Sequence, residues 1–361
     1  MLLTLLSPDQ PDFRLLAVEF IASALVVLFL ALKLSKYSDA LEQTGLISAV
    51  WIGTFFLAIV TSLPEAVTSI GAAIIPEAAP LGAANLFGSN CFNLFIVFVL
   101  DAAYRRGPVL LGVASGLVVP VVGGILLIAL AGLALAYNAT GGADSTHAAP
   151  GIGLSAAIVI AYLSLARMSA KAQLLPDTSE QFTEDTPKTD YTYTTTRIFS
   201  RLAIYAVLLI AAAVWLLNVC DAVAVTPFSI GSRQVVLHQT VTGSLVLAAA
   251  TSFPELFVCM ALLRFGQINM AIANLLGSNM ANMLLLPVMH AATGRADFYS
   301  QIPPQGDLVL IFAAILMSAL LIFGILSRSR KAILGVGREP LLIFIVYVVA
   351  AGLVVQSGLR F

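Results

Sequence analysis

Ten long apolar runs dominate the sequence, and each is close to the length that crosses a lipid bilayer. A hydrocarbon core of about 30 Å requires about 20 consecutive apolar residues in a helix. Hydrophobic residues make up 60% of the chain and charged residues only 10%, whereas ordinary soluble domains are about 25% charged. A water-soluble globule is therefore excluded, and a polytopic membrane protein in contact with lipid is expected. The runs cover residues of about 14–33, 45–75, 80–103, 108–136, 150–168, 198–219, 236–263, 268–292, 307–326 and 340–357.

The lysine and arginine residues support this count and predict an orientation. If the N-terminus is outside and the helices alternate, 14 of the 18 basic residues lie on inner loops and helix ends and 4 on outer ones. Such an excess marks the cytoplasmic side. We therefore expect a multi-pass protein of the plasma (inner) membrane with both termini outside. The inner group is Lys33, Lys36, Arg105, Arg106, Arg167, Lys171, Lys188, Arg197, Arg201, Arg264, Arg328, Arg330, Lys331 and Arg338, and the outer group is Arg14, Arg233, Arg295 and Arg360.

Charge and cysteine content exclude several classes of partner. The net charge of −1 gives no basic groove for nucleic acid. Cys91, Cys220 and Cys259 stand singly in apolar stretches without the spacing of a zinc site or a disulfide framework. The first residues lack the basic region and cleavage site of a signal peptide, so the first helix is expected to remain. No cofactor is expected, and the oligomeric state is left open.

An internal repeat divides the chain into two halves. Residues 61–65 read TSLPE and residues 84–93 read ANLFGSNCFN, while residues 251–255 read TSFPE and residues 273–282 read ANLLGSNMAN. Five predicted helices separate the copies, and an odd number inverts the second copy in the membrane. Inverted repeats with interrupted helices are typical of secondary transporters. The predicted fold is all-α, with ten transmembrane helices in two inverted five-helix repeats.

The domain boundaries follow from this repeat. The first repeat is expected to cover residues 1–171, with its motif region at about 45–103. The second is expected to cover residues 198–361, with its motif region at about 236–292. Residues 172–197 form the one long polar run, rich in Thr, Pro and acidic residues, and they are predicted to be a disordered cytoplasmic linker.

The first part of each motif predicts an oxygen-rich break in a membrane helix. Pro64 lacks an N–H, so the helix carbonyl four residues earlier loses its partner and the neighbouring carbonyls loosen. Thr61 and Glu65 are four residues apart and share one helix face, as do Thr251 and Glu255. Each break therefore combines a carboxylate, hydroxyls and loosened carbonyls. Such a set suits Ca²⁺ or Na⁺, and no thiolate or imidazole lies nearby to favour zinc or copper.

The second part of each motif adds hydroxyl and amide groups at helical spacing. Ser89 and Asn93 are four residues apart, as are Ser278 and Asn282. Asn90 and Asn279 are expected to point away from this face and to tie neighbouring helix backbones together. Asn85 and Asn274 have two interpretations, either support of a ligand residue or a purely structural role. Gly88 and Gly277 predict close approach of another backbone.

Two acidic residues stand out because of their depth in the membrane. An acidic residue at the bilayer centre costs at least about 2.5–3.5 kcal/mol on insertion scales and is a functional candidate by default. Of the 19 acidic residues, Glu65 and Glu255 are the two that lie in mid-span with polar neighbours. Glu19 is better explained by a helix contact or by snorkelling, and Asp101 and Asp221 by positions near helix ends. Matched glutamates in a duplicated motif predict a cation site.

These motifs resemble those of the calcium/cation antiporter superfamily, in particular its sodium/calcium exchanger branch, and the resemblance covers the whole chain. The family carries two repeats with the patterns G-T-S-x-P-E and G-N-x-x-G-S-N-x-x-N or D. The resemblance implies that Glu65 and Glu255 bind Ca²⁺ with the backbone oxygens of Thr61 and Thr251. It also implies that the flanking Na⁺ sites are formed by Ser62, Ser89, Ser252, Ser278, Asn93 and Asn282.

Two departures from the family pattern are relevant to the transported ions. The glycine before T-S-x-P-E is replaced by Val60 in one copy and Ala250 in the other. The last motif position is Asn in both copies, whereas many prokaryotic relatives have Asp in one. The two glutamates then give the site a formal charge of −2, which one Ca²⁺ or two Na⁺ would neutralise. The stoichiometry and the driving ion are left open.

The expected activity is exchange of Ca²⁺ for Na⁺ by alternating access, and three rivals are considered. A Ca²⁺/H⁺ antiporter would use the same glutamates, although the many hydroxyl and amide groups favour Na⁺. A cation channel would need a continuous pore, which an inverted repeat with one site per chain does not suggest. An enzyme would need a base or metal set near a glutamate, and His147, His238 and His290 lie in loops or near helix ends.

Overall fold

The computed structural model describes most of the chain. The described residues are 13–75, 78–104, 107–140, 148–172, 193–225, 229–230, 233–234, 242–295, 297–302, 304–333 and 335–358. The polar linker predicted at residues 172–197 lies almost entirely outside this part, as do His147 and His238, and nothing is described of the side chain of Asp221.

The first half of the chain forms five membrane-crossing units. They are the long helix α1 (Phe13–Gln43), the bent unit α2 (Ala49–Trp51), η1 (Ile52–Leu57), α3 (Ala58–Thr61) and α4 (Leu63–Ile74), and the helices α5 (Ala79–Ala103), α6 (Val118–Thr140) and α7 (Ala148–Ala172). Two short 3₁₀ turns, η2 (Val109–Gly112) and η3 (Ser115–Leu117), precede α6.

The second half repeats this order. Its units are α8 (Thr195–Val225), the bent unit η5 (Thr242–Leu247), α10 (Ala248–Thr251) and α11 (Phe253–Arg264), and the helices α12 (Ile268–Thr293), α13 (Pro304–Ser327) and α14 (Arg338–Gly358). A 3₁₀ turn, η6 (Phe298–Gln301), joins α12 to α13. Two antiparallel pairs of two-residue strands, β1 (Ser229–Ile230) with β2 (Arg233–Gln234) and β3 (Ala332–Ile333) with β4 (Val336–Gly337), lie in connections.

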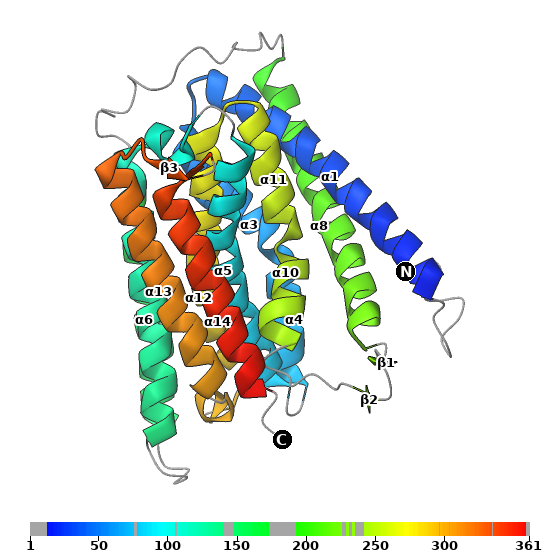
Figure 1. Ribbon diagram of the computed structural model, residues 1–361, viewed down its shortest axis with the longest axis vertical. Coiled ribbons are helices and arrows are strands. Elements are labelled where there is room, and N and C mark those ends of the chain that lie inside the picture. The colour runs from blue at the N-terminus through cyan, green and yellow to red at the C-terminus, as the bar shows by residue number, and fades with distance from the viewer. Residues whose placement is uncertain are drawn as a thin grey trace.

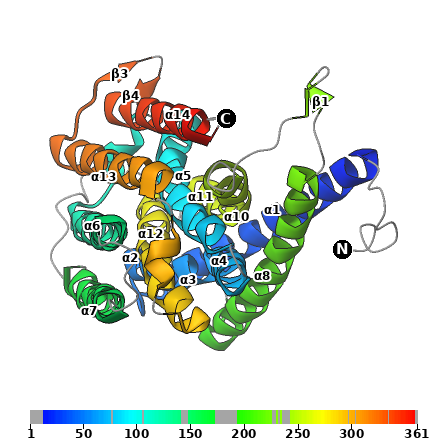
Figure 2. The same ribbon diagram turned by 90° about the horizontal axis from the view of Figure 1, so that it is seen from below.

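The predicted all-α fold of ten spans in two inverted repeats is confirmed. Within the described residues, eight continuous helices are long and apolar enough to cross a membrane, and the number is ten if each bent unit is one span. The motif helices α5 and α12 are buried in the centre, whereas α7 and α14 are largely exposed at the periphery. Figure 2 shows the same order in end view, with α1 and α8 together on one side and α6, α7, α13 and α14 around the rest.

Two boundaries differ by about ten residues from the sequence prediction. The fourth apolar run was expected to begin near residue 108, but α6 begins at Val118, after the turns η2 and η3. The first apolar run ends near residue 33, but α1 continues to Gln43. The polar side chains of this extension are buried: Ser35, Ser38 and Asp39 are each at most 3% exposed. Ser35 Oγ donates to the Val258 carbonyl of α11 at 3.3 Å. Packing against α11 therefore continues the helix beyond the point where hydropathy alone ends it.

The two long helices α1 and α8 pair along their length and lean across one flank of the bundle (Figure 1). Trp215 Nε1 of α8 donates to Glu19 Oε1 of α1 at 2.9 Å. This bond confirms that Glu19 makes a helix contact. It also links two helices that carry none of the motif residues.

Candidate cation site

Both bent units break at a serine inside the repeated motif. The backbone leaves the helical region at Ser62 (φ −85°, ψ 4°) and at Ser252 (φ −89°, ψ 6°). The helices on either side are inclined by 44° and 46°. In each case proline occupies the first turn of the following helix, where its missing N–H removes no bond within that helix. The sequence predicted a kink caused by Pro64, and the structure places the break two residues earlier.

The break puts each glutamate in the first turn of a new helix. Glu65 lies in the first turn of α4 and Glu255 in the first turn of α11. Helix N-termini carry a partial positive charge and unpaired N–H groups, both of which stabilise a carboxylate. Both side chains are completely buried. The interruption therefore provides a favourable electrostatic position for a negative charge inside the membrane.

The two repeats exchange hydrogen bonds at the carboxylates. Ser252 Oγ of the second repeat donates to Glu65 Oε1 at 3.1 Å, and Ser62 Oγ of the first donates to Glu255 Oε1 at 3.3 Å. Ser278 Oγ of α12 adds a 3.4 Å bond to Glu255 Oε1. Because each glutamate is bound by a serine of the other repeat, the halves form one shared site.

The motif threonines lie at the same crossing point. Thr61 Oγ1 donates to the Leu57 carbonyl at 3.0 Å and lies 3.4 Å from both Ser278 Oγ and Asn274 Oδ1. Thr61 is thus held between its own helix and α12.

Thr251 has the matching environment. Its Oγ1 lies 3.3 Å from Ser89 Oγ and 3.3 Å from Asn85 Oδ1. Asn85 in turn donates to Ser69 Oγ of α4 at 3.0 Å. Asn85 therefore connects the Thr251 side chain to α4 from its place on α5.

The motif asparagines form a second layer of contacts between α5 and α12. Asn93 Nδ2 donates to Asn279 Oδ1 at 3.0 Å, and Asn282 Nδ2 donates to Asn90 Oδ1 at 3.1 Å. Asn279 Nδ2 also donates to the Asn90 backbone carbonyl at 3.3 Å. The expected backbone tie is present for the Asn279 side chain. The expectation that Asn90 and Asn279 point away from Asn93 and Asn282 is wrong, because each is bonded to one of them. Each copy of the motif has Asn at both of these positions, and this repetition was the sequence signal that could have indicated the contacts between asparagines.

Close helix packing brings these layers together. A Cβ atom on Gly277 would overlap the Thr54 carbonyl oxygen, and one on Gly53 would overlap the Met270 carbonyl. Both bent units also contain a π-helical turn, η1 or η5, a feature that is frequent at functional sites. The expected close backbone approach at Gly277 is confirmed.

The candidate site contains buried acceptor atoms that no protein donor reaches. Four of them belong to the matched motif positions, and within the described part of the chain none has a hydrogen-bond partner: Glu65 Oε2, Glu255 Oε2, Asn93 Oδ1 and Asn282 Oδ1. An unsatisfied buried polar group costs about 1–3 kcal/mol. Oxygen atoms of carboxylates and amides are the ligands that hard cations prefer. The chemistry of these free atoms therefore fits Ca²⁺ or Na⁺.

Thr54 is a further polar residue that the sequence analysis did not select. Its Oγ1 is buried and has no partner among the described residues. It lies in η1, the turn whose backbone meets Gly277. A hydroxyl residue recurs at the matching position of the second repeat, Ser244, and this recurrence was the signal that could have identified it.

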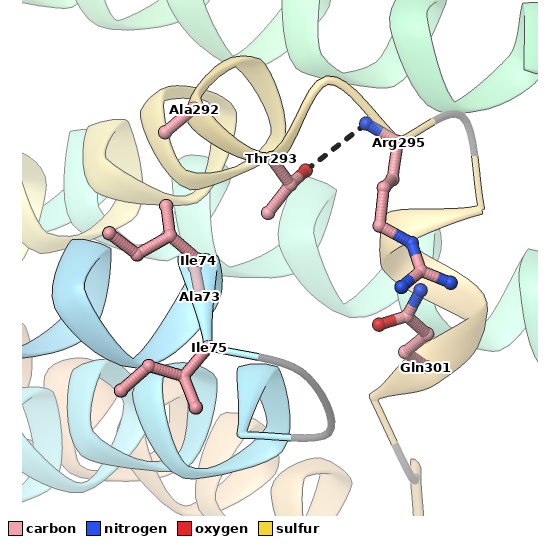
Figure 3. A pocket seen from close by; sticks show the side chains of 7 residues that line it. All are labelled: Ala73, Ile74, Ile75, Ala292, Thr293, Arg295 and Gln301. Carbon is pink, nitrogen blue, oxygen red and sulfur yellow. Dashed lines mark hydrogen bonds between the residues drawn. The ribbon is translucent and has the colours of Figure 1, made fainter.

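A solvent-accessible cavity lies away from the carboxylates. It has a volume of about 140 Å³ and lies between the end of α4 and the end of α12 (Figure 3). Its lining combines apolar and polar side chains: Ala73, Ile74, Ile75, Ala292, Thr293, Arg295 and Gln301. None of the ten predicted site residues is among them.

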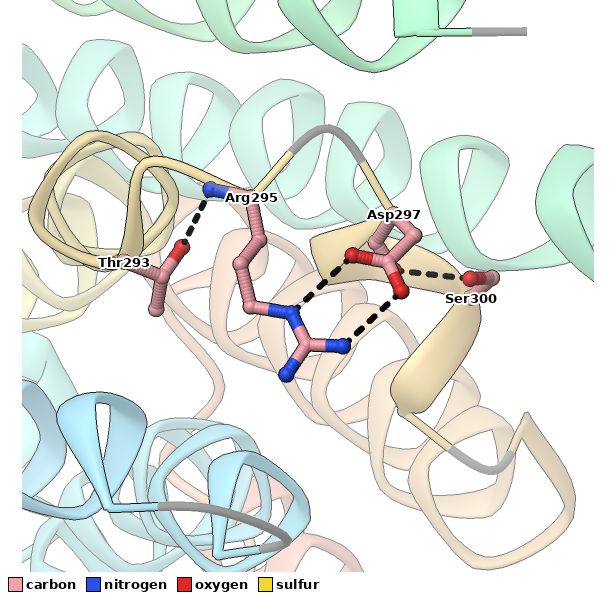
Figure 4. A network of polar contacts seen from close by, with 4 residues as sticks. All are labelled: Thr293, Arg295, Asp297 and Ser300. Atoms are coloured by element: carbon pink, nitrogen blue, oxygen red, sulfur yellow. Dashed lines mark hydrogen bonds and ion pairs between the residues drawn. The ribbon is translucent and has the colours of Figure 1, made fainter. Parts of the chain in front are cut away.

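The charged residue of this cavity is already paired. The Arg295 guanidinium forms two 3.1 Å bonds with the exposed Asp297 carboxylate (Figure 4). These bonds hold the pKa of Asp297 below its usual range. The cavity therefore lacks an acidic group free to receive a cation, and the glutamate crossing remains the candidate site.

Comparison with known proteins gives the family. The sequence profile described as sodium/calcium exchanger protein matches residues 15–170 and 199–353, which include both copies of the motif. The chain belongs to the sodium/calcium exchanger family. This is a family of membrane transporters and not of enzymes. No curated protein sequence matches the chain.

The fold of this exchanger-family chain is shared with solved structures of the sodium-calcium exchanger NCX_Mj. One of them, soaked with 2.5 mM Na⁺ and 0.1 mM Sr²⁺, has a TM-score of 0.66 at 19% identity and covers 94% of this chain and 98% of its own. Another, soaked with zero Na⁺ and Ca²⁺, has a TM-score of 0.63 at 20% identity and covers 96% and 100%. At this level of identity the likeness concerns the fold.

His290, the histidine that lies within the described residues, takes part in contacts between helices. His290 Nδ1 lies 2.8 Å from Ser155 Oγ, which also lies 2.8 Å from the Tyr299 hydroxyl. The His290 ring stacks on Phe298. These contacts tie α7, the end of α12 and η6 together. Within the described residues, no group of three His, Cys, Asp or Glu side chains is placed to hold a metal ion.

Proposed function

We propose that the chain exchanges Ca²⁺ for Na⁺ through the crossing of the two repeats, with Glu65 and Glu255 as the charged ligands. The observation that carries this proposal is the set of four buried oxygen atoms on Glu65, Glu255, Asn93 and Asn282 that have no hydrogen-bond partner among the described residues. The carboxylates supply a formal charge of −2, which one Ca²⁺ or two Na⁺ neutralise. The backbone oxygens of Thr61 and Thr251 and the hydroxyls of Ser62, Ser89, Ser252 and Ser278 complete an all-oxygen environment for cations of either charge.

The mechanism of this proposal is alternating access. Two ionised carboxylates in a membrane interior are costly, so the carrier changes conformation only when cations compensate them. This condition makes transport an exchange. Helices α1 and α8 are the proposed moving gate, because they are paired with each other, contain no motif residue and lie on one flank of the motif helices.

The proposal places the protein in a prokaryotic plasma membrane with both termini outside. It rests on the distribution of 14 basic residues to one side and 4 to the other. The carrier would then move Ca²⁺ between the cytoplasm and the exterior. A thiol-specific label applied to intact cells, reacting with a cysteine introduced at either terminus, tests this orientation.

Exchange of Ca²⁺ for protons is the second candidate function. Each glutamate carries one oxygen that accepts no hydrogen bond from the described residues, and such an oxygen can take a proton as well as contact a cation. Two protons would compensate the same charge of −2. The surrounding hydroxyls and amides favour Na⁺, because proton exchange requires the carboxylates alone.

Ca²⁺ flux into proteoliposomes distinguishes the two candidates. One set of vesicles carries an outward Na⁺ gradient without a pH gradient, and the other carries an outward proton gradient without Na⁺. The proposal predicts Ca²⁺ uptake driven by Na⁺ alone. Uptake driven only by protons would assign the second function, and no uptake under either gradient would overturn both.

A further inference from the structure

Two asparagines outside the proposed ligand set contact the two asparagines inside it. Asn279 Oδ1 accepts the Asn93 amide N–H at 3.0 Å, and Asn90 Oδ1 accepts the Asn282 amide N–H at 3.1 Å. All four side chains are at most 6% exposed. Each bond joins α5 to α12, so each proposed amide ligand is held by a residue of the opposite repeat.

These bonds decide which end of each ligand amide is available to a cation. An Asn side chain carries an oxygen that can bind a cation and an NH₂ group that cannot. Because Nδ2 of Asn93 and of Asn282 is used by the opposite helix, Oδ1 of each remains buried without a partner among the described residues. A rotated amide would instead present N–H groups to the site and repel a cation.

Asn279 is itself held in the required orientation. Its Nδ2 donates to the Asn90 backbone carbonyl at 3.3 Å, so its Oδ1 is the end that faces Asn93. A backbone carbonyl can only accept, and it therefore fixes Asn279 without depending on any other side chain. The orientation of Asn93 is thus set by a chain of two hydrogen bonds that begins at the α5 backbone.

We propose that Asn90 and Asn279 are positioning residues that direct the amide oxygens of Asn282 and Asn93 at the transported cation. This role rests on the proposed function, because it concerns the same site. The role depends on Asn at positions 93 and 282. An ionised Asp at position 282 would place a carboxylate oxygen against the Asn90 amide oxygen, unless the Asn90 amide rotated. The asparagine at the third position of each G-S-N sequence thereby acts on the ligand of its partner repeat.

Replacement of Asn279 tests the role in Ca²⁺ binding to the purified full chain, measured by calorimetry in detergent. Asn279→Leu removes the acceptor of Asn93, and we expect Ca²⁺ affinity to fall about 10–100-fold, the usual effect of losing a partner of a metal ligand. Asn279→Asp in its protonated form can still accept from Asn93 and donate to the Asn90 carbonyl, so we expect it to restore most of the affinity.

Asn218→Leu is the matched control. Asn218 is exposed on α8 and donates to the Val214 carbonyl of its own helix at 2.8 Å. The same replacement there is expected to leave Ca²⁺ affinity at the wild-type value. Melting temperatures measured without Ca²⁺ identify any variant that fails to fold.

A double replacement separates positioning from a structural effect. If Asn279 acts through Asn93, Asn279→Leu loses its effect on affinity once Asn93→Ala has removed the ligand. An equal further loss in the Asn93→Ala background would overturn the positioning role, as would unchanged affinity in Asn279→Leu. In either case, wild-type Ca²⁺ binding would leave the proposed function standing. A wild-type protein that binds no Ca²⁺ would overturn the proposed function itself.

Discussion

At the scale of single residues, the two glutamates differ from the other buried acids in their surroundings. Asp101 is buried but accepts two 2.6 Å hydrogen bonds, from the backbone N–H groups of Val109 and Gly337. Glu19 accepts a bond from Trp215. Glu65 and Glu255 instead receive serine hydroxyls on one oxygen and keep the other unpartnered within the described residues. Asp307 is also buried, and neither of its carboxylate oxygens has a partner among the described residues. The two glutamates are therefore distinguished by a combination: one unpartnered oxygen and, on the other oxygen, a serine donor from the opposite repeat.

Replacing either glutamate tests the role of charge directly. Glu65→Gln and Glu255→Gln keep side-chain volume and the oxygen that accepts from serine, so the fold is expected to persist. With one charge left, Ca²⁺ would leave an uncompensated positive charge inside the membrane. We expect Ca²⁺ transport in proteoliposomes to fall to background in both variants.

Glu19→Gln is the matched control for these two variants. Its amide oxygen can still accept from Trp215 Nε1, so transport is expected at the wild-type rate. Ca²⁺ transport retained in both Glu65→Gln and Glu255→Gln would remove the glutamates from the site.

Packing at Gly277 gives a second prediction at this scale. A Cβ atom there would overlap the Thr54 carbonyl and approach Ala58 Cβ within 2.7 Å, and overpacking of this kind costs about 1–3 kcal/mol. We expect Gly277→Ala to lower the melting temperature in detergent. At Gly124 of α6, a Cβ atom meets nothing within 4 Å. Gly124→Ala should therefore melt at or above the wild-type temperature, and equal melting of the two variants would contradict the packing argument.

At the scale of elements, the interrupted helices create the site. The break at Ser62 ends α3 at Thr61 and starts α4, so a helix N-terminus faces the buried carboxylate of Glu65. The second repeat does the same with Ser252 and Glu255. A continuous helix would offer neither the unpaired N–H groups nor the change of direction. The 44° and 46° bends are thus part of the function proposed for the molecule.

Restoring a continuous helix is expected to impair transport. Pro64→Ala returns the missing N–H and permits the Val60 carbonyl to be satisfied, which favours straightening of the bend at Ser62. We expect Ca²⁺ affinity to fall at least about tenfold, as when a ligand's support is lost, while the protein stays folded. Pro120 also lies in the first turn of its helix, but α6 follows the 3₁₀ turn η3 and not an α-helical segment of the same span, so Pro120→Ala restores no bond across a break. Equal Ca²⁺ affinities in Pro64→Ala and Pro120→Ala would argue against the break as a determinant.

Much of this architecture could be predicted from the sequence, because hydropathy and the motif can each be recognised within a short stretch of the chain. The ten spans follow from hydropathy and the inverted order from two copies of one motif. The bonds of Ser252 to Glu65 and of Ser62 to Glu255 join residues 187 and 193 positions apart and follow from neither. The extension of α1 to Gln43 could not be predicted, since its buried polar side chains are stabilised by α11. The bonds of Asn90 and Asn279 depend on residues more than 180 positions away, which no helical period encodes.

At the scale of the whole molecule, the paired helices α1 and α8 have contacts that connect them to the motif core. Gln267, between α11 and α12, donates to Asp39 Oδ1 of α1 at 2.6 Å and to Glu42 Oε2 at 3.3 Å. Ser35 adds its bond to α11. These bonds fix one end of α1 to the second repeat. If α1 slides during transport, this end must be released in each cycle.

Cross-linking that end tests the sliding helix. In a protein carrying Asp39→Cys and Gln267→Cys, a short bifunctional thiol reagent joins α1 to the α11–α12 turn. We expect transport to stop and to recover after reduction, while Ca²⁺ binding to the detergent-solubilised protein persists. Either single cysteine variant treated with the same reagent provides the control. Full transport in the cross-linked protein would mean that α1 does not move.

Radiolabelled Ca²⁺ counterflow tests the central claim, that one site shared by the two repeats carries Ca²⁺ only in exchange. Vesicles containing the wild-type protein are loaded with unlabelled Ca²⁺, without Na⁺ or a pH gradient, and diluted into a trace of labelled Ca²⁺. The account predicts transient accumulation of label above its equilibrium level, and none in vesicles loaded without Ca²⁺. Label that rises to equilibrium without an overshoot, at the same rate with and without internal Ca²⁺, would indicate a channel and contradict the account.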